Sequence, residues 1–265
     1  MVRSLWTAAS GMNGQQANID AISNNLSNVN TTGYKPVRTE FEDLIYQTQR
    51  LAGTPATDLT SRPLGSQVGH GVKVAATQRM FQQGALQSTG NPYDVAITGE
   101  GFLRVMLRDG SVAYTRDGSF KVDSEGQLVT SQGYRVQPEI IFPEGFLHET
   151  IAIGTTGEVT VKIPDVEDPI TVGQLELYRF VNPAGLSALG ENLFKVSLGS
   201  GEAIAGLPGR EGMGELQHRF LEMSAVSTVK EMVNLIVAQR AYEFNSKAVQ
   251  TSDNMLGVAT NLKRT

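Results

Sequence analysis

Both ends of the chain carry large apolar residues at steps of seven. These are Leu5, Met12, Ile19 and Leu26 near the N-terminus, and Leu235, Tyr242, Val249 and Leu256 near the C-terminus. A seven-residue repeat places side chains on one stripe of an α-helix and is the pattern of a coiled-coil seam. Because chain termini usually fray, two such stripes predict ends that pair with each other or with other copies of the chain.

Composition argues against several classes of protein. The chain has 265 residues, a net charge of −5 and no cysteine. An acidic chain is a poor candidate for nucleic-acid binding, which normally uses a basic surface. The lack of cysteine excludes disulfides and thiolate metal sites. No segment approaches the ~18 consecutive apolar residues of a membrane span, and no apolar run follows the first residues as it would in a cleaved secretory signal. We therefore expect no nucleic acid partner and no membrane insertion.

Residues 4–30 predict one long helix with an unusual polar face. That face is rich in amides, among them Asn25 and Asn28, and Arg3 and Asp20 are its only charged residues. Amide side chains both donate and accept hydrogen bonds, so this face suits burial among neighbouring polar helices. A surface helix of odd composition is the alternative. Gly33 is expected to end the helix in the left-handed conformation.

The second long helix is predicted to begin at Thr228. Thr228 and Glu231 have the spacing of a capping box, directly before an apolar run without proline. Small or polar residues, among them Asn245, follow the large stripe residues by three positions, which allows close helix approach with polar registration. Packing of this helix on a β-core of its own chain remains the alternative.

The middle of the chain reads as β-structure. Residues 52–71 are rich in Gly, Pro, Ser and Thr and predict a loop or an extended ribbon. Asp109-Gly110, Asp117-Gly118 and Glu125-Gly126 recur every eight residues between apolar runs, and such pairs are strong hairpin signals. Gly173–Phe180 predicts a further strand. We therefore expect an α+β fold class, with long N- and C-terminal helices paired as a coiled-coil-like domain and a central, mostly antiparallel β-domain.

No constellation of residues indicates catalysis or a cofactor. His70, His148 and His218 share no metal-ligand spacing. Four carboxylates lie near the predicted hairpins, at Asp109, Asp117, Asp123 and Glu125. Turns explain these positions well. A carboxylate pair of the kind that hydrolyses glycans stays a minor alternative, because such a pair is set in space and not in sequence.

Two long motifs give a resemblance to a known family. Residues 23–35 read S-N-N-L-S-N-V-N-T-T-G-Y-K, and residues 231–247 include E-M-V-N-L-I-V-A-Q-R-A-Y-E. They resemble the N- and C-terminal signatures of the bacterial flagellar rod, hook and hook-junction proteins, with Ser23 and Ser27 in place of two alanines. Within this family the chain is most similar to the distal rod subunits, on the basis of its length and of stretches such as Tyr114–Phe120.

The resemblance implies a structural role and no enzymatic activity. Family members of the distal rod polymerise helically into a hollow drive shaft that carries torque from the motor to the hook, through peptidoglycan and the P and L rings. The implied partners are other copies of the chain, proximal rod proteins, hook protein, P-ring and L-ring proteins, and the flagellar type III export apparatus, which exports such subunits to the periplasmic rod without a cleaved signal. A proximal rod or hook subunit is the alternative within the family.

The resemblance also predicts a division of labour along the chain. Residues 1–32 and 226–265 would form a helical inner-tube domain, residues 33–75 a connecting segment with an extended loop, and residues 76–225 an outer β-domain. The predicted subunit-interface residues are Leu5, Met12, Ile19, Asn25, Leu26, Asn28, Leu235, Tyr242, Asn245, Val249 and Leu256.

Overall fold

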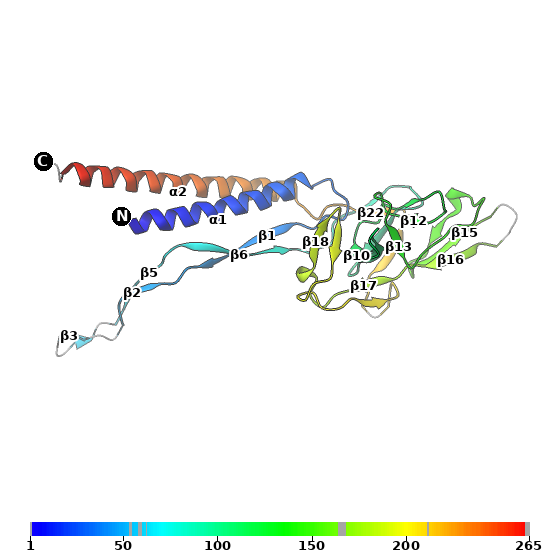
Figure 1. Cartoon of the computed structure of the whole chain (residues 1–265), viewed down its shortest axis with the longest axis horizontal. Helices are drawn as coiled ribbons and strands as arrows, with labels where there is room; N and C mark the ends of the chain where they lie inside the picture. The colour runs from blue at the N-terminus through cyan, green and yellow to red at the C-terminus, as the bar shows by residue number, and fades with distance from the viewer. Residues whose placement is uncertain are drawn as a thin grey trace. The chain divides into compact units, whose positions relative to one another are not determined.

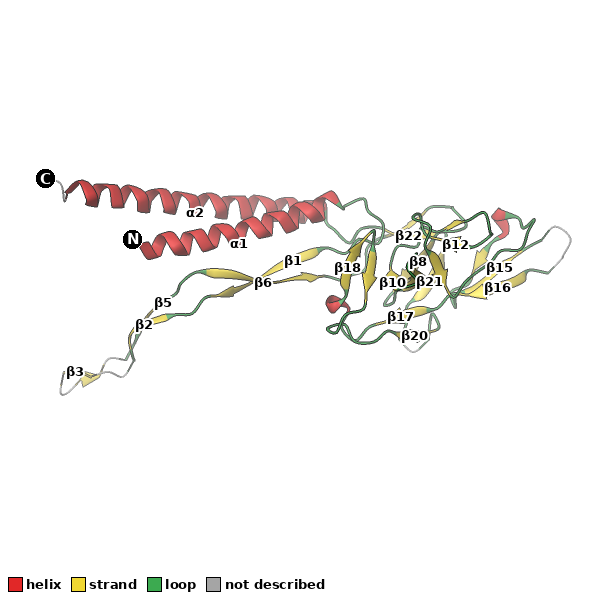
Figure 2. Cartoon of the chain, viewed as in Figure 1, coloured by secondary structure: helices red, strands yellow, loops and turns green. Residues whose placement is uncertain are grey.

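The protein is described by a computed structural model that covers residues 2–52, 55–57, 60–61, 63–163, 168–210 and 212–262. The chain divides into two compact units. The helical unit contains the residues up to Ser27, Val37–Gln78, and the residues from Ser227 onward; the β unit contains Asn28–Pro36 and Arg79–Val226. Figure 2 shows the two long helices in the first unit and the strand-rich second unit. The α+β fold class is confirmed, while the three-part division by assembly role stays a prediction.

The helical unit is built on α1, Val2–Ser27, and α2, Thr228–Leu262. Helix α1 ends three residues before the predicted boundary at residue 30, in a turn in which Thr31 N–H donates to the Asn28 carbonyl at 3.2 Å. Asn side chains compete with helical hydrogen bonding, which favours this early end. Helix α2 begins at Thr228 as predicted, but the Ser227 carbonyl accepts from Glu231 N–H at 2.9 Å, so Ser227 is the N-cap residue. Neither helix, as far as the chain is described, is long and apolar enough to cross a membrane.

A long two-stranded ribbon completes the helical unit. Strand β1, Val37–Asp43, pairs with β6, Val72–Arg79; β2, Gln47–Arg50, pairs with β5, Ser66–Val68; and β3, Pro55–Thr57, pairs with β4, Thr60–Ser61. Of the two conformations predicted for residues 52–71, the ribbon is the one observed; residues 53–54, 58–59 and 62 lie outside the described residues.

The β unit centres on a seven-stranded sheet of order β11-β12-β13-β9-β10-β19-β18 with antiparallel pairings. The strands are β9 Leu103–Met106, β10 Val112–Thr115, β11 Lys121–Val122, β12 Leu128–Val129, β13 Arg135–Gln137, β18 Ser187–Gly190 and β19 Leu193–Lys195.

Smaller antiparallel sheets surround it. A three-stranded sheet joins β14 Ala152–Ile153, β15 Glu158–Val161 and β16 Ile170–Gln174. The two-stranded sheets pair β17 Leu177–Arg179 with β20 Ile204–Gly206, β8 Val95–Thr98 with β21 Glu215–His218, and β7 Leu86–Ser88 with β22 Phe220–Glu222. Short 3₁₀ turns span His148–Thr150 and Pro183–Gly185.

The core of the β unit has an aliphatic part and an aromatic part. Buried side chains such as Val105, Val159 and Leu175 form the larger cluster. The aromatic cluster contains Phe102, Tyr114, Tyr178, Phe180 and Phe194, whose rings meet mainly edge to face. Edge-to-face contact is favourable for aromatic rings beyond the area that they bury.

Two of the three predicted hairpin turns are confirmed. Asp109-Gly110 joins the antiparallel pair β9 and β10, and Glu125-Gly126 joins β11 and β12. The prediction of a hairpin at Asp117-Gly118 is wrong, because β10 pairs with β9 and β19 and not with β11. Gly118 instead crosses β8 so closely that a methyl group there would lie 1.6 Å from the Val95 carbonyl oxygen.

The predicted strand over Gly173–Phe180 is also wrong as a single element. It contains the end of β16 and all of β17, which belong to different sheets. The buried Leu175, between the two strands, donates its N–H to the Gly157 carbonyl at 2.7 Å. The alternation of apolar and polar residues therefore continues through a change of sheet.

Candidate functional site

Helices α1 and α2 pack against each other within the helical unit. Ser4 and Ser252 share a hydrogen bond of 3.1 Å between their hydroxyls, and a methyl group at Gly11 would lie 2.8 Å from Asn245 Nδ2. From Ser4 to Gly11 the chain advances by seven residues along α1, while from Ser252 to Asn245 it goes back by seven residues along α2. The two helices run antiparallel and side by side (Figure 1).

The line of closest contact joins small and polar residues, Ser4 with Ser252 and Gly11 with Asn245. Among the buried residues of the two helices, Ala8, Asn25, Ala238 and Ser252 are also small or polar, whereas Ile22 is a large apolar residue. The predicted large residues flank this line and are half-buried: Leu5, Met12, Ile19, Leu26, Leu235, Val249 and Leu256. Tyr242 is 38% exposed. Much of each stripe is therefore used inside the chain, and the contact of these residues with other copies stays a prediction.

A second apolar surface lies on the outside of α2. Its members are Val229, Met232, Val233, Ile236, Val237, Phe244, Met255 and Val258, which are all exposed. Phe244 keeps 67% of its surface exposed, and Trp6 on α1 keeps 73%. We call the α2 residues the outer apolar face. Exposed apolar residues that share one face of a helix are typical of a surface that binds a partner.

The first part of the N-terminal motif closes the end of α1. The buried Asn25 side chain donates from Nδ2 to the Val37 carbonyl at 2.8 Å and accepts from Val37 N–H at 2.8 Å. The Asn25 side chain satisfies both backbone groups of Val37, the first residue of β1. It therefore fixes the start of β1 against the C-terminal end of α1. The predicted interface residue Asn25 therefore has a role within its own chain, and its role between copies is still a prediction.

The second part of the motif is held by the β unit. Asn28 accepts from the Thr31 hydroxyl at 3.1 Å, and the Thr32 carbonyl accepts from Asn192 Nδ2 at 3.1 Å. Gly33 has a φ of +65°, and a methyl group there would lie 2.9 Å from the Asp117 nitrogen. Only glycine fits this backbone conformation and this space together.

The motif ends at a fully buried lysine. Lys35 Nζ lies 2.5 Å from Glu222 Oε1 and donates to the Gln82 carbonyl at 2.6 Å. Glu222 also accepts from Arg116 Nε at 2.9 Å, through its other carboxylate oxygen, and from Gly84 N–H at 2.8 Å. The side chains of Lys35 and Glu222 are 0% exposed and that of Arg116 is 4% exposed. We call Lys35, Glu222 and Arg116 the ionic staple.

The ionic staple has one more positive than negative group. Burial, followed by the neighbouring Arg116 guanidinium, lowers the pKa of Lys35 from 10.5 to about 8, although Glu222 acts in the opposite direction. Arg116 is further held by the carbonyls of Gly101 and Gly99, at 3.0 and 2.9 Å. Sequence reasoning missed Glu222 and Arg116, because neither lies in the motif that contains Lys35 and a buried ion pair leaves no periodic signal.

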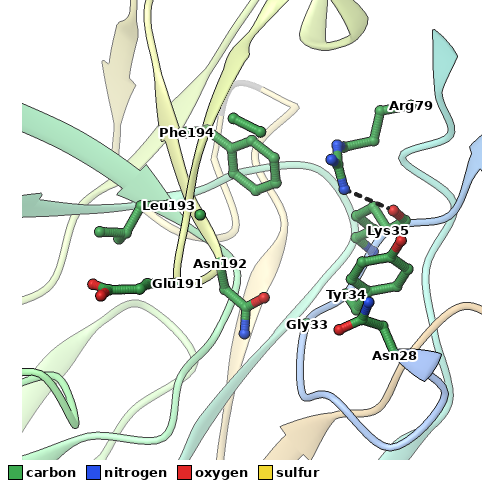
Figure 3. A pocket seen from close by; sticks show the side chains of 11 residues that line it. Asn28, Gly33, Tyr34, Lys35, Arg79, Glu191, Asn192, Leu193 and Phe194 are labelled. Carbon is green, nitrogen blue, oxygen red and sulfur yellow. Dashed lines mark hydrogen bonds between the residues drawn. The ribbon is translucent and has the colours of Figure 1, made fainter. Parts of the chain in front are cut away.

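A pocket of about 160 Å³ opens beside the motif within the β unit (Figure 3). Asn28 and Tyr34 line one side, and Asn192 and Phe194 line the other. Arg79 lies between the rings of Tyr34 and Phe194, with its guanidinium carbon 5.8 and 5.5 Å from their centres. It donates to the Lys35 carbonyl at 2.9 Å. The pocket thus places the predicted interface residue Asn28 on a partly open surface.

Asp109 and Asp117, two of the four candidate carboxylates, accept hydrogen bonds within the turns that contain them. Asp109 accepts from the Ser111 hydroxyl and N–H at 2.7 and 2.9 Å, and these bonds lower its pKa below the ordinary value. Asp117 accepts from Ser119 N–H at 3.1 Å. A general acid for glycan hydrolysis needs the opposite, a raised pKa. Within the described ranges, no three His, Asp or Glu residues form a group that could hold a metal ion.

Comparison with known proteins identifies the family. The model for flagella basal body rod proteins matches residues 5–35, the model for the flagellar hook protein FlgE/F/G D1 domain matches residues 96–161, and the model for the flagellar basal body rod FlgEFG protein C-terminal region matches residues 217–262. The first model contains the motif that ends at Lys35, and the third contains Glu222.

Curated relatives match over the whole length. The flagellar basal-body rod protein FlgG of Borreliella burgdorferi is 65% identical over 264 residues, which cover 100% of both chains. FlgG of Buchnera aphidicola is 48% identical over 97% of this chain and 98% of its own. FlgG of Bacillus subtilis is 41% identical over 100% of both chains. The chain therefore belongs to the flagellar basal-body rod protein family and is a structural subunit of the basal body, similar to the distal rod protein FlgG.

Proposed function

We propose that the chain polymerises through its terminal helices, with the α1–α2 pair as the building block of the wall of a hollow rod. The predicted interface residues are Leu5, Met12, Ile19, Asn25, Leu26, Asn28, Leu235, Tyr242, Asn245, Val249 and Leu256. They act at two levels. Those along the seam set the shape of the helix pair, and those that stay partly exposed contact neighbouring copies.

The outer apolar face of α2 is the observation that carries this proposal. Val233, Ile236 and Val237 are each more than half exposed. Full burial of an exposed side chain of this kind contributes roughly 1.5–3 kcal/mol, and covering the part that is still exposed would contribute a proportionate share for each of the three. A subunit whose partners are identical copies in open helical array needs heterologous contacts of this kind. The second copy is therefore the occupant that we assign to this face.

The remaining partners follow from the family resemblance. We propose contacts with proximal rod proteins and hook protein at the two ends of the polymer, and with P-ring and L-ring proteins along it. Delivery is by the flagellar type III export apparatus, without a cleaved signal. The subunit has no catalytic activity in this proposal, which the turn hydrogen bonds of Asp109 and Asp117 support.

The test is Ile236→Asp, because Ile236 is 57% exposed and a charge there does not disturb the core of one copy. We expect the purified variant to keep its helix content but to form no rods in cells, as seen by electron microscopy of basal bodies. Gln239→Asp, at an exposed polar position of the same helix, is the matched control and should assemble normally. Normal rods in the Ile236 variant would exclude the outer apolar face as the contact surface.

A further inference from the structure

Two chain segments that connect to the long helices lie against each other in the β unit. Residues 28–36 follow α1 directly, and residues 223–226 lie between β22 and the start of the helical unit at Ser227. Gly33 N–H donates to the Glu222 carbonyl at 2.7 Å, and Ala225 N–H donates to the Tyr34 carbonyl at 3.1 Å. The exit from α1 and the approach to α2 are thus hydrogen-bonded to each other.

The ionic staple lies at this crossing. The backbone carbonyl of Glu222 accepts a hydrogen bond from Gly33, and its side-chain carboxylate forms an ion pair with Lys35. Lys35 belongs to the segment after α1, and Glu222 is the last residue of β22, directly before the segment that leads to α2. Arg116 and Gly84 supply the remaining donors to the carboxylate, so both of its oxygens are engaged. One side chain therefore joins both connecting segments to the body of the β unit.

Stability alone does not explain a buried cluster of this composition. Desolvation of buried ions offsets much of their attraction, and apolar residues of similar volume often stabilise a fold as well or better. Two cations around one carboxylate are less favourable still, and burial, followed by the neighbouring Arg116, lowers the pKa of Lys35. The charged groups instead specify a geometry. Lys35, Arg116 and Gly84 all donate to the Glu222 carboxylate, and charge-assisted hydrogen bonds of this kind restrict the segments that carry these residues to one arrangement.

We propose that Glu222 is a positioning residue, which through Lys35 and Arg116 holds the two connecting segments in a single arrangement that assembly requires. A shaft that carries torque needs both of its helix connections to be rigid. This inference rests on the proposed rod function for its biological role, but the coupling of the two segments can be measured in the purified protein alone.

Lys35→Met is the sharpest variant. It cuts the ionic link between the two segments and leaves the neutral pair of Arg116 and Glu222 in place, whereas Glu222→Gln leaves two buried cations unpaired and is expected to unfold the unit. Hydrogen–deuterium exchange of the full chain should show at least tenfold faster exchange at the amides of Gly33 and Ala225. Amides in the central strands β9 and β10 should be unchanged.

Lys121→Met, at an exposed lysine of the same unit, is the matched control and should leave all rates unchanged. No acceleration at Gly33 and Ala225 in the Lys35 variant would overturn the proposal. Acceleration spread evenly through β9 and β10 would overturn it as well, because Lys35 would then contribute to general stability and not to the position of the segments.

The requirement of this arrangement for rod assembly is tested in a bacterial strain that lacks its own copy of this rod protein. The wild-type chain should restore swimming in soft agar, and Lys35→Met at equal protein level should not. Full swimming by the variant, together with wild-type rescue, would contradict the assembly requirement while the rod function stands. Failure of the wild-type chain would instead contradict the rod function, and the exchange experiment would still decide whether the staple couples the segments.

Discussion

Gly11 of α1 faces Asn245 of α2 so closely that a methyl group on Gly11 would lie 2.8 Å from Asn245 Nδ2. The glycine allows the helix backbones to approach, and the amide fills the space that it leaves. One seven-residue step away, Ser4 and Ser252 meet hydroxyl to hydroxyl at 3.1 Å. Polar contacts at this repeat specify the register of two helices at a cost in stability.

Gly11→Val should therefore destabilise the helix pair. Valine is a better helix former than glycine, so any loss comes from packing, and we expect ~2 kcal/mol from the overpacked seam. Asn245→Ala in the same chain should recover at least half of it, because the amide no longer occupies the space. Denaturant titrations followed by helical circular dichroism measure both effects.

Gly257→Ala is the control for the glycine effect itself. Gly257 lies in α2 with open space around the position of a side chain. Its replacement should stabilise the helix by ~1 kcal/mol. A Gly11→Val variant that is as stable as wild type, or a double variant that is no better than the single one, would contradict the assigned contact.

Gly118→Ala should be among the most damaging single changes in the β unit. Its added methyl group would meet the Val95 carbonyl oxygen at 1.6 Å, so β8 must shift, at an expected cost of ~3 kcal/mol. Gly133→Ala offers the contrast, since Gly133 has a φ of +84° and open space. It should lose only ~1–2 kcal/mol, from the left-handed backbone. Equal losses in thermal unfolding would show that Gly118 is not sterically required.

Lys35 should impart an unusual pH dependence. Its pKa is about 8 in the folded chain, against 10.5 for an ordinary lysine, so between these values the unfolded chain binds more protons than the folded one. The unfolding free energy contributed by this group therefore rises from about pH 8 to about pH 10.5 and is flat outside this window. In urea titrations across this range, the difference between wild type and Lys35→Met should grow with pH; a constant difference would rule out the lowered pKa.

Leu235→Asp tests the seam from the side of α2. Leu235 is half-buried on the predicted stripe of α2, and a carboxylate placed there without a partner costs several kcal/mol. We expect loss of swimming although the subunit is still exported, with Asn234→Asp, at the exposed neighbouring position, swimming normally. Swimming by the Leu235 variant, or failure of the Asn234 control, would contradict the seam.

The parts of the fold with periodic sequence signals could be predicted. The seven-residue repeats predicted both helices, and two Asp-Gly or Glu-Gly turns predicted their hairpins, because these signals are local. The hairpin predicted at Asp117-Gly118 was wrong because the same local signal can have another cause. Its glycine meets a distant steric need, the crossing of Val95, and nothing in its neighbourhood distinguishes that need from a hairpin turn.

Part of the candidate site could be predicted as well. The stripe residues were predicted from their seven-residue period, and the terminal motif from its resemblance to a known family. The ionic staple could not be predicted from the residues, since Glu222 lies 187 positions from Lys35 and 106 from Arg116. A lysine between a predicted helix end and a proline is expected at the surface, and only the fold brings the carboxylate and the second cation to it.

The most direct test of the account is a density map of basal bodies isolated from cells in which this chain is the only subunit of its kind. We expect a rod whose inner wall consists of antiparallel α1–α2 pairs, with the outer apolar face of α2 covered by a neighbouring copy. A rod in which this face points to solvent, or intact rods from cells that express the chain without residues 229–265, would contradict it.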